Sequence, residues 1–310
     1  MSSVLGQFRQ HLTESLSAIE SHDSREIAST QTLSAALELV RTKISKIDFP
    51  LIQPVRTVHH FSCTGGTLIA KCIASMANTV VLNEIDLFSS IPFRAANNRF
   101  TPTDILALLN QAGSPASDEL IVDLFLDSID RLREHYSRRG QYLVLRDHTH
   151  SHYLYGRGER SVSDMRSLLM QANIPCVSMV TVRDPIRSYA SMVKKGWENH
   201  IQPASFDEYC QRYLRFLTAY AGVKIVKYED FVSNPKKVMR DICNHLSLTY
   251  FDRFEEVFDS FDFSGDSGRS SGKIEPRPNL ELTEPLRNEI LSSESYTELA
   301  AMLKYEPLGK

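Results

Sequence analysis

VHHFSCTGGTLIAKCIA, residues 58–74, is typical of a short buried strand followed by a tight loop and a helix. Gly65 and Gly66 let the backbone turn without a Cβ atom, and Thr64 and Thr67 place hydroxyl groups where the first helical N–H groups lack intrahelical partners. The positive end of the helix dipole and converging N–H donors suit a phosphate or sulfate. For this stretch alone, an ordinary strand-to-helix connection is the alternative.

The composition indicates a globular α/β protein. With 310 residues and 42% hydrophobic content, the chain can bury a substantial core, and one large domain is the simplest arrangement. The formal net charge of −3 is spread over mixed-sign sequence without a basic block, which argues against a nucleic-acid partner. Any anion site must therefore be built locally.

The lack of a targeting signal and the cysteine spacing indicate a cytoplasmic protein. Residues 1–21 lack a basic segment followed by an apolar run, and no stretch approaches the ~20 apolar residues of a membrane span. We therefore expect a protein without a membrane span. The five cysteines are odd in number, scattered and never in a CxxC pair, which argues against a disulfide framework and a structural zinc site.

Strand and helix patterns alternate along most of the chain. Strands are predicted at residues 57–61, 79–83, 142–146, 176–182 and 223–227, and helices at 67–77, 117–139, 161–171, 205–220 and from Pro185. His148, His150 and His152 would share one face if the third strand continued through them. The alternation predicts a mainly parallel central sheet with helices on both faces and a ligand site at the carboxyl ends of the strands.

The remaining segments complete a single predicted domain of residues 1–310. Residues 3–47 have the periodicity of two helices, so residues 1–48 are predicted as a helical N-terminal extension packed on the domain. Residues 84–116 have weak periodicity and several prolines, as binding loops or lids often do. Residues 259–279 are rich in Ser, Gly and Pro and are predicted as a flexible loop.

Polar peptides follow each predicted strand. They are the glycine loop, Asn83-Glu84, Arg146-Asp147-His148, Arg183-Asp184-Pro185 and Tyr228-Glu229-Asp230. Over residues 55–275 these peptides together resemble the sulfotransferase family. The resemblance implies a P-loop-like fold and sulfuryl transfer from 3′-phosphoadenosine 5′-phosphosulfate to a hydroxyl of a small molecule or glycan. Adenosine 3′,5′-bisphosphate would be the product, and no metal is expected.

The resemblance also implies a set of residues that bind the nucleotide. The loop Cys63-Thr64-Gly65-Gly66-Thr67-Leu68 is similar to the family's 5′-phosphosulfate loop, and Arg183 with Ser191, eight residues apart, is similar to its 3′-phosphate motif. Tyr228 corresponds to a tyrosine beside the adenine. The stretch that includes Gly268, Arg269 and Lys273 looks like the late loop that closes over the 3′-phosphate.

The acceptor hydroxyl needs a general base, because removing its proton in the transition state makes it a better nucleophile for in-line displacement. Arg146-Asp147-His148 occupies the place of the family's Lys-Thr-His segment, which makes His148 the first candidate base and Arg146 a donor to the sulfuryl oxygens. Glu84 is the second candidate, since some members use a glutamate just after the second strand.

Three other functions fit parts of the sequence, and one of them is a protein related to this family that binds the nucleotide without catalysis. A face shared by His148, His150 and His152 would suit a metal-dependent hydrolase, although Arg146 beside them would oppose a dication. A nucleotide-binding, kinase-like phosphotransferase would also use a glycine loop, but this loop lacks the Gly-Lys-Thr/Ser ending. The loop also departs from the sulfotransferase pattern, because Cys63 stands where the family usually has a basic residue.

Overall fold

The computed structural model describes residues 52–88, 105–154, 163–263, 272–277 and 282–308. The chain divides between Ile52 and Gln53, and the description below concerns the part from Gln53 onward. The predicted helical extension of residues 1–48 lies outside the described residues, and so do residues 89–104 of the predicted lid.

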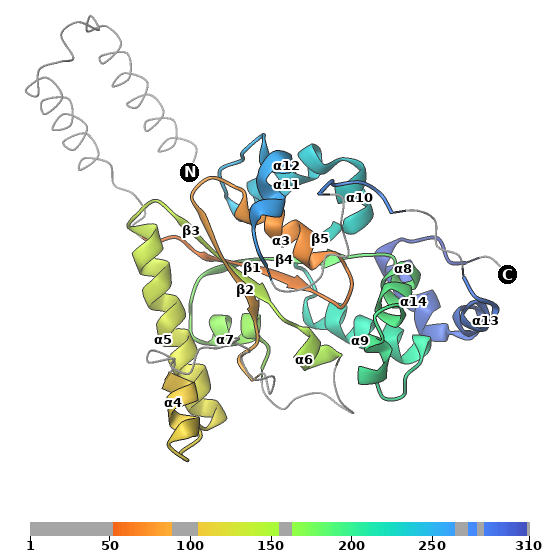
Figure 1. Ribbon diagram of the computed structural model, residues 1–310, viewed down its shortest axis with the longest axis horizontal. Coiled ribbons are helices and arrows are strands. Elements are labelled where there is room, and N and C mark those ends of the chain that lie inside the picture. The colour runs from red at the N-terminus through yellow and green to blue at the C-terminus, as the bar shows by residue number, and fades with distance from the viewer. Residues whose placement is uncertain (1–51, 89–104, 155–162, 264–271, 278–281, 309–310) are drawn as a thin grey trace, which may run out of the picture. The chain divides into compact units, whose positions relative to one another are not determined.

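Five strands of the described part form one sheet in which every neighbouring pair is parallel (Figure 1). The strands are β1 (Val55–His60), β2 (Thr79–Ile85), β3 (Tyr142–Asp147), β4 (Cys176–Val182) and β5 (Lys224–Lys227), in the order β2-β3-β1-β4-β5. Because β1 is central and parallel to its neighbours, the loop after β1 lies at the edge where the other strands also end. The predicted α/β fold with a parallel sheet is confirmed.

Helices connect the strands and follow them. They are α3 (Gly66–Ala74), α4 (Ile105–Gln111), α5 (Asp118–Ser137), α6 (His150–Tyr153), α7 (Met165–Gln171), α8 (Pro185–Val193), α9 (Phe206–Ala219), α10 (Tyr228–Ser233), α11 (Pro235–Leu246), α12 (Phe254–Val257), α13 (Glu284–Ser292) and α14 (Glu294–Leu303). Two short 3₁₀ segments, η1 (Trp197–His200) and η2 (Phe258–Ser260), lie among the described residues.

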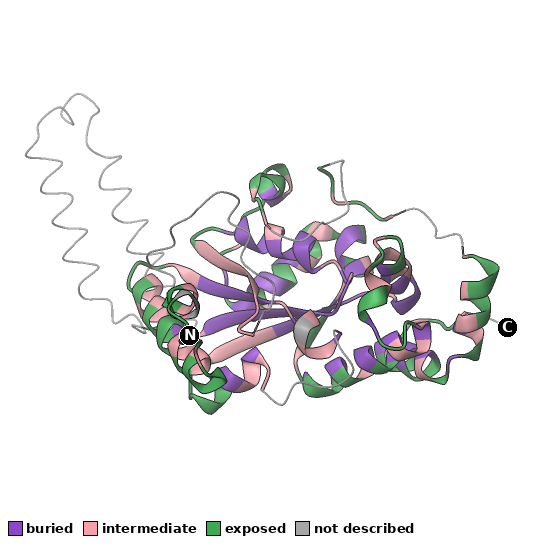
Figure 2. Ribbon diagram, turned by 60° about the horizontal axis from the view of Figure 1, so that its bottom comes forward, coloured by how far each residue is buried: buried purple, intermediate pink, exposed green. Residues whose placement is uncertain are grey.

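The helices cover both faces of the sheet, as Figure 1 shows. On one face, Val58 and Val144 of the central strands pack with residues of α3 and α11. On the other face, Leu145 packs with α5 and α7, while Val182 packs with α8, α9 and α14. Burying an apolar side chain of this size contributes about 1.5–3 kcal/mol. Figure 2 shows the central strands buried and the outer helix surfaces exposed.

Local signals in the sequence set several helix starts. Ser117 and Ser205 accept hydrogen bonds from backbone N–H groups three residues later and cap α5 and α9, at the positions where the sequence predicts these helices to start. Pro185 occupies the first turn of α8, also as predicted. The predicted start of a helix at Ser161 is wrong, because Asp164 itself caps α7, which begins at Met165.

The chain after β3 also differs from one of the sequence patterns. The strand ends at Asp147 and the chain then forms the short helix α6, so the period-two arrangement of His148, His150 and His152 does not exist. The three imidazoles therefore do not share a strand face, which removes the geometric basis of the hydrolase alternative.

Candidate functional site

The glycine loop forms a strand–loop–helix turn between β1 and α3. Thr64 donates from its hydroxyl to the Phe61 carbonyl over 2.8 Å, and Cys63 and Gly65 have positive φ angles of 60° and 85°. Gly65 is the N-cap residue of α3 and has no side chain to accept from the first helical N–H groups. No cap side chain therefore occupies these N–H groups, and an anion bound by them stays a prediction.

The two glycines are required by the side chains that lie against them. A Cβ atom on Gly65 would overlap the ring of Tyr228, with Cε2 at 2.8 Å, and one on Gly66 would overlap His60, whose Cβ would be 2.9 Å away. Real Cβ atoms do not approach other atoms this closely. The loop is thus fitted between the ends of β1 and β5, and any side chain there would displace a ring.

Arg183 joins this loop to the ends of β4 and β5. It is 6% exposed, its Nη1 donates to the Cys63 carbonyl over 3.2 Å, and its guanidinium lies 4.7 Å from the centre of the Tyr228 ring. Its backbone N–H donates to the buried Tyr213 hydroxyl over 3.2 Å. Burial raises the pKa of Tyr213, so this hydroxyl keeps its proton.

The hydrogen bonds of the Arg183 side chain do not include all of its nitrogen atoms. The Nε of Arg183 is buried and has no hydrogen-bond partner among the described residues. Buried donors are normally satisfied, so a guanidinium nitrogen without a described partner beside this glycine turn would suit an anion such as phosphate. Ser191, the other residue of this motif, is half-buried in α8, and no hydrogen bond between described residues joins it to Arg183.

The ends of β4 and β5 are tied together by Glu229. Its carboxylate accepts from the Asp184 backbone N–H over 3.1 Å and from the Tyr305 hydroxyl over 2.7 Å. Asp184 in turn caps α8 by accepting from the Arg187 N–H. These bonds hold Arg183 and Tyr228 on neighbouring strand ends.

A second cluster surrounds the guanidinium of Arg146, which is 2% exposed at the end of β3. Its Nη1 lies 2.6 Å from both Asn83 Oδ1 and Glu84 Oε1. Adjacent residues of a regular strand point to opposite faces, but β2 has a register irregularity between Leu82 and Ile85, and Glu84 has a positive φ of 55°. The irregularity brings both side chains to one guanidinium.

The other end of this guanidinium reaches the glycine loop. Arg146 Nη2 donates to Thr67 Oγ1 over 2.9 Å and lies 3.1 Å from His60 Nε2. Burial lowers the pKa of Arg146, and the Glu84 carboxylate opposes this change. Arg146 therefore connects the candidate base on β2 with the first turn of α3.

His148 follows the cluster at the end of β3. Its Nε2 lies 2.9 Å from His150 Nδ1 and 3.5 Å from Glu84 Oε2, and its Nδ1 lies 3.6 Å from Asp86 Oδ2. The structure thus brings both candidate bases, His148 and Glu84, together. Asp86 contacts the opposite side of the imidazole.

Two histidines beside these residues are held neutral. Burial lowers the pKa of His60 well below its ordinary value, and the charge of Arg146 lowers it further. Burial likewise lowers the pKa of His150, followed by the effects of His148 and Arg146, while Asp86 opposes the change. His60 and His150 therefore add no positive charge beside the guanidinium of Arg146.

The other predicted site residues are more dispersed. The Leu68 side chain is buried in the core between α3 and the sheet, so only its backbone N–H can face a ligand. Lys273 is exposed, and Gly268 and Arg269 lie outside the described residues. Lys71, which is not a predicted site residue, forms an ion pair with Asp259 over 3.3 Å.

Three polar residues of this edge, Asn83, His60 and Asp147, were not predicted as site residues from the sequence, although Asn83 and Asp147 belong to the polar peptides that follow the predicted strands. Asn83 and His60 contact Arg146. Asp147 accepts from His59 over 2.7 Å and from the Tyr220 hydroxyl over 3.2 Å. Asn83, His60 and Asp147 are all polar residues at strand ends, and this position is the feature by which the sequence could have indicated them as site residues. Their partners could not be read from spacing, because the partners lie on other strands and helices.

The residues that the structure describes contain no grouping of His, Cys, Asp and Glu that could hold a metal ion. No helix within the described ranges is long and apolar enough to cross a membrane.

The fold and site define an α/β protein whose glycine turn, suited to an anion, lies at the carboxyl edge of a parallel sheet. Residues 179–252 match the model of the sulfotransferase family. The matched segment contains Arg183, Ser191 and Tyr228, and the match confirms the resemblance to this family that the sequence predicts.

Two solved structures are similar to the chain. The sulfotransferase domain of the Synechococcus PCC 7002 olefin synthase is 18% identical, with a TM-score of 0.49, covering 84% of this chain and 97% of that one. A sulfotransferase from Alicyclobacillus acidocaldarius is 14% identical, with a TM-score of 0.44, covering 82% and 97%. No curated protein matches the chain.

Proposed function

We propose that the protein is a sulfotransferase that moves a sulfuryl group from 3′-phosphoadenosine 5′-phosphosulfate to an acceptor hydroxyl by in-line displacement. The observation that carries the proposal is the position of Arg183, which contacts both the glycine loop and Tyr228 and lies within the segment matched by the sulfotransferase family model. One buried arginine therefore links the two parts of a bipartite nucleotide site.

The residues present fit such a donor. The first N–H groups of α3, with Thr64 and Thr67, would hold the 5′-phosphosulfate, and Arg183, whose buried Nε has no described partner, would hold the 3′-phosphate with Ser191. Tyr228 would lie beside the adenine, and Gly268, Arg269 and Lys273 would belong to the covering loop. The donor supplies an activated sulfuryl group on a good leaving phosphate.

Arg146 prepares the loop for this anion. Because Thr67 Oγ1 accepts from Arg146 Nη2, the hydroxyl hydrogen of Thr67 points elsewhere and can be donated to a phosphosulfate oxygen. The guanidinium also places positive charge behind the loop, where Cys63 supplies none. Charge held in a buried position stabilises the transition state where negative charge develops.

Glu84 and His148 form the acid–base part of the site. The Glu84 carboxylate is held by Arg146 and lies 3.5 Å from His148 Nε2. Either Glu84 or His148 can therefore take the proton of the acceptor hydroxyl as the acceptor oxygen bonds to sulfur, while the other residue holds the base in position. His148 remains the first candidate, and Glu84 the second. Glu84 has a positive φ, a strained conformation that often occurs at functional positions.

Calorimetric titration with adenosine 3′,5′-bisphosphate tests the donor assignment. We expect saturable one-to-one binding and weaker binding of adenosine diphosphate, which lacks the 3′-phosphate. Tight binding of adenosine triphosphate with no response to the bisphosphate would instead favour the phosphotransferase alternative. A complete absence of nucleotide binding would refute both.

A further inference from the structure

We propose that Tyr209 and Tyr213 of α9 hold the glycine loop and Arg183 in a fixed relation to each other, and that this relation makes the donor site selective for a nucleotide with a 3′-phosphate. The inference rests on the proposed sulfotransferase function and adds two positioning residues to its donor site. Both tyrosines are 0% exposed, so each acts through the backbone that it binds and not by touching the nucleotide.

The two tyrosines lie on the same side of α9, because residues four apart in a helix are neighbours on its surface. The ring of Phe61, just before the glycine loop, packs against both of them. Its centre lies 4.7 Å from that of Tyr213 and 5.2 Å from that of Tyr209. Burial raises the pKa of both hydroxyls, so each keeps a hydrogen that it can donate.

Tyr209 binds the start of the glycine loop. Its hydroxyl donates to the Ser62 carbonyl over 3.2 Å. This carbonyl belongs to the peptide unit that leads into Cys63, whose positive φ of 60° is uncommon for a residue with a Cβ atom. Tyr209 therefore helps to hold the loop in a conformation that Cys63 does not favour by itself.

Tyr213 binds the backbone of Arg183. Its hydroxyl accepts from the Arg183 N–H over 3.2 Å and donates to the Arg183 carbonyl over 3.4 Å. The side chain of Arg183 then reaches the loop, where its Nη1 donates to the Cys63 carbonyl. The peptide units on both sides of Cys63 are thus bound, one by Tyr209 and the other by Arg183.

These hydrogen bonds form a closed ring of contacts. The ring runs from Tyr209 through Ser62 and Cys63 to Arg183, and it returns to α9 through Tyr213. A movement of the loop or of Arg183 would break a hydrogen bond of a buried group, which is costly. The ring therefore fixes where the loop N–H groups lie relative to the arginine that would hold the 3′-phosphate.

α9 is suited to this role because it is anchored to other parts of the chain. Arg212, which is 3% exposed, donates to the carbonyls of Leu154 and Gln202. At the start of the helix, the Phe206 N–H donates to the Glu289 carboxylate over 2.6 Å. Groups held by a rigid element are placed more precisely than groups held by a loop.

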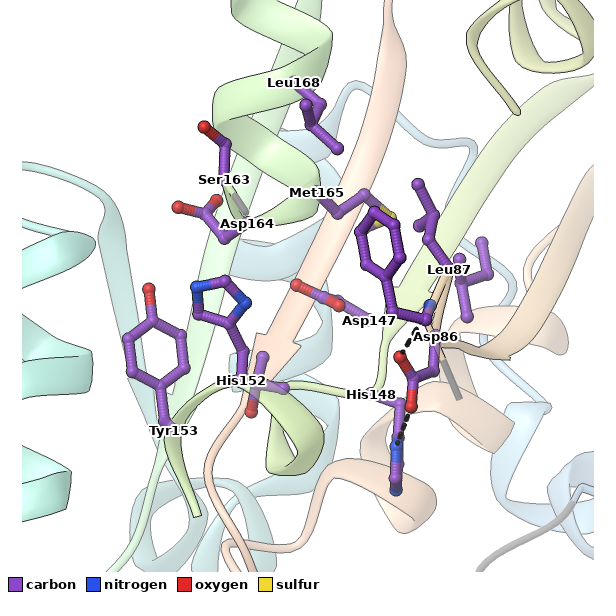
Figure 3. Close-up of a pocket in the computed structure, with 13 residues that line it drawn as sticks. Asp86, Leu87, Asp147, His148, His152, Tyr153, Ser163, Asp164, Met165 and Leu168 are labelled. Atoms are coloured by element: carbon purple, nitrogen blue, oxygen red, sulfur yellow. Dashed lines mark hydrogen bonds and ion pairs between the residues drawn. The ribbon is translucent and has the colours of Figure 1, made fainter. Parts of the chain in front are cut away.

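The candidate base is not part of this ring. Figure 3 shows His148 and Asp86 beside a small hollow whose wall comes from the chain around the ends of β2 and β3, from α6 and from the start of α7. Neither Tyr209 nor Tyr213 is among the described residues that line this hollow. Substitutions of the two tyrosines should therefore change nucleotide binding without changing the surroundings of His148.

Tyr213→Phe is the first test, because phenylalanine keeps the ring that packs on Phe61 and removes only the hydroxyl. The Arg183 N–H then loses its buried acceptor, and the position of Arg183 is no longer fixed. In calorimetric titration, the affinity for adenosine 3′,5′-bisphosphate should fall roughly three- to tenfold. The affinity for adenosine diphosphate, which lacks the 3′-phosphate, should change less than about twofold.

Tyr209→Phe should have a different effect, because the glycine loop would bind the 5′-phosphate that both nucleotides carry. We expect both affinities to fall by the same factor, roughly threefold, so that their ratio is unchanged. A merely structural role would lower both affinities in both variants, and it would not change the ratio in Tyr213→Phe. An unchanged ratio in Tyr213→Phe, or unchanged affinities in Tyr209→Phe, would overturn the proposal.

Tyr296→Phe is the matched control. Tyr296 is also buried, with 3% exposed, and its hydroxyl also accepts from a backbone N–H, that of Leu308, over 3.3 Å. This hydrogen bond joins α14 to the chain that follows it, not to the donor site. Both nucleotide affinities should stay within about twofold of the wild type. A change in the ratio as large as that in Tyr213→Phe would mean that any lost tyrosine hydroxyl has this effect, and would overturn the proposal.

Hydrogen exchange of the Arg183 amide separates this proposal from the proposed function, because it needs no ligand. The amide should exchange roughly three- to tenfold faster in Tyr213→Phe than in the wild type. If the wild type binds neither nucleotide but the exchange is faster in Tyr213→Phe, the positioning of Arg183 stands and the sulfotransferase function is wrong. If both nucleotides bind as expected, and neither their ratio nor the exchange changes in Tyr213→Phe, the function stands and the positioning role is wrong.

Discussion

Arg146 Nη1 lies 2.6 Å from Glu84 Oε1 at the carboxyl edge of the sheet, in a pair whose arginine side chain is 2% exposed. The same guanidinium reaches Asn83, Thr67 and His60. A planar guanidinium can serve several acceptors in fixed directions, whereas an ammonium cannot. This geometry ties the candidate base to the loop that would hold the donor.

Arg146→Lys should therefore impair both stability and transfer. Lysine keeps the charge but cannot hold these acceptors together, and leaving a buried acceptor without its hydrogen bond costs about 1–3 kcal/mol of unfolding free energy. Urea unfolding measures the loss, and labelled sulfuryl transfer measures the activity.

Arg138→Lys is the matched control, because Arg138 pairs with Glu134 on the exposed surface of α5. The same substitution there should change the unfolding free energy by less than about 0.5 kcal/mol. Equal effects of the two substitutions would contradict the role assigned to Arg146.

Gly65→Ala should abolish nucleotide binding. A methyl group at this position would overlap the Tyr228 ring, and the positive φ of 85° adds a strain of about 1 kcal/mol for any residue with a Cβ. The ring or the loop must move, which disrupts the turn that presents the N–H groups. Titration with adenosine 3′,5′-bisphosphate checks the result.

Gly140→Ala measures the effect of backbone strain alone, without the steric overlap that an added Cβ meets at Gly65. Gly140 also has a positive φ, of 67°, but a Cβ there would meet no atom within 4 Å. We expect a loss of about 1 kcal/mol in unfolding free energy with unchanged nucleotide affinity. A similar loss of binding in both variants would count against the close fit of Gly65 to Tyr228.

The sequence predicts most of the fold because its strands are short apolar and β-branched runs with clear boundaries. β4 begins and ends at the predicted residues, Cys176 and Val182. The strand–loop–helix turn was also predictable, since paired glycines let the backbone turn without a Cβ atom, whereas the binding of an anion there stays a prediction.

The details of the site were less predictable. The irregularity of β2 at Glu84 depends on a positive φ that glutamate rarely adopts, so no propensity indicates it. Likewise, the alternation of His148, His150 and His152 suggests a strand, but the chain turns into α6 after Asp147. In both cases contacts with distant residues override the local pattern.

Arg183→Ala should weaken binding of adenosine 3′,5′-bisphosphate by about 1.5–3 kcal/mol, as expected for a charge-assisted hydrogen bond. Binding of adenosine diphosphate should change much less, because it lacks the 3′-phosphate. Titration calorimetry with both nucleotides gives the comparison.

Arg240→Ala is the control for this substitution. Arg240 also lies over a tyrosine ring, 4.9 Å from the centre of Tyr250, but it lies on α11 and pairs with Asp252. Its loss should leave both nucleotide affinities unchanged. If Arg183→Ala weakened the binding of the two nucleotides equally, the arginine would not recognise the 3′-phosphate.

His148→Ala and Glu84→Gln distinguish the two candidate bases. If His148 removes the acceptor proton, its replacement should abolish transfer with nearly normal nucleotide affinity, because neither its ring nor its partners belong to the glycine loop. In that case Glu84→Gln should reduce the rate of sulfuryl transfer less than His148→Ala does. Turnover retained in His148→Ala and lost in Glu84→Gln would assign the base to Glu84.

Stability should fall as the pH is lowered, because burial lowers the pKa of His60 and His150 well below 6.5. Below this value the unfolded chain binds a proton at each position and the folded chain does not, so each histidine removes about 1.4 kcal/mol of stability per pH unit. The loss continues until the lowered pKa of the folded state is reached. Urea unfolding of the wild type and His150→Gln between about pH 7.5 and 5.5 measures this slope, which the substitution should reduce by about one proton. An unchanged slope in His150→Gln would show that His150 is not held neutral by the fold.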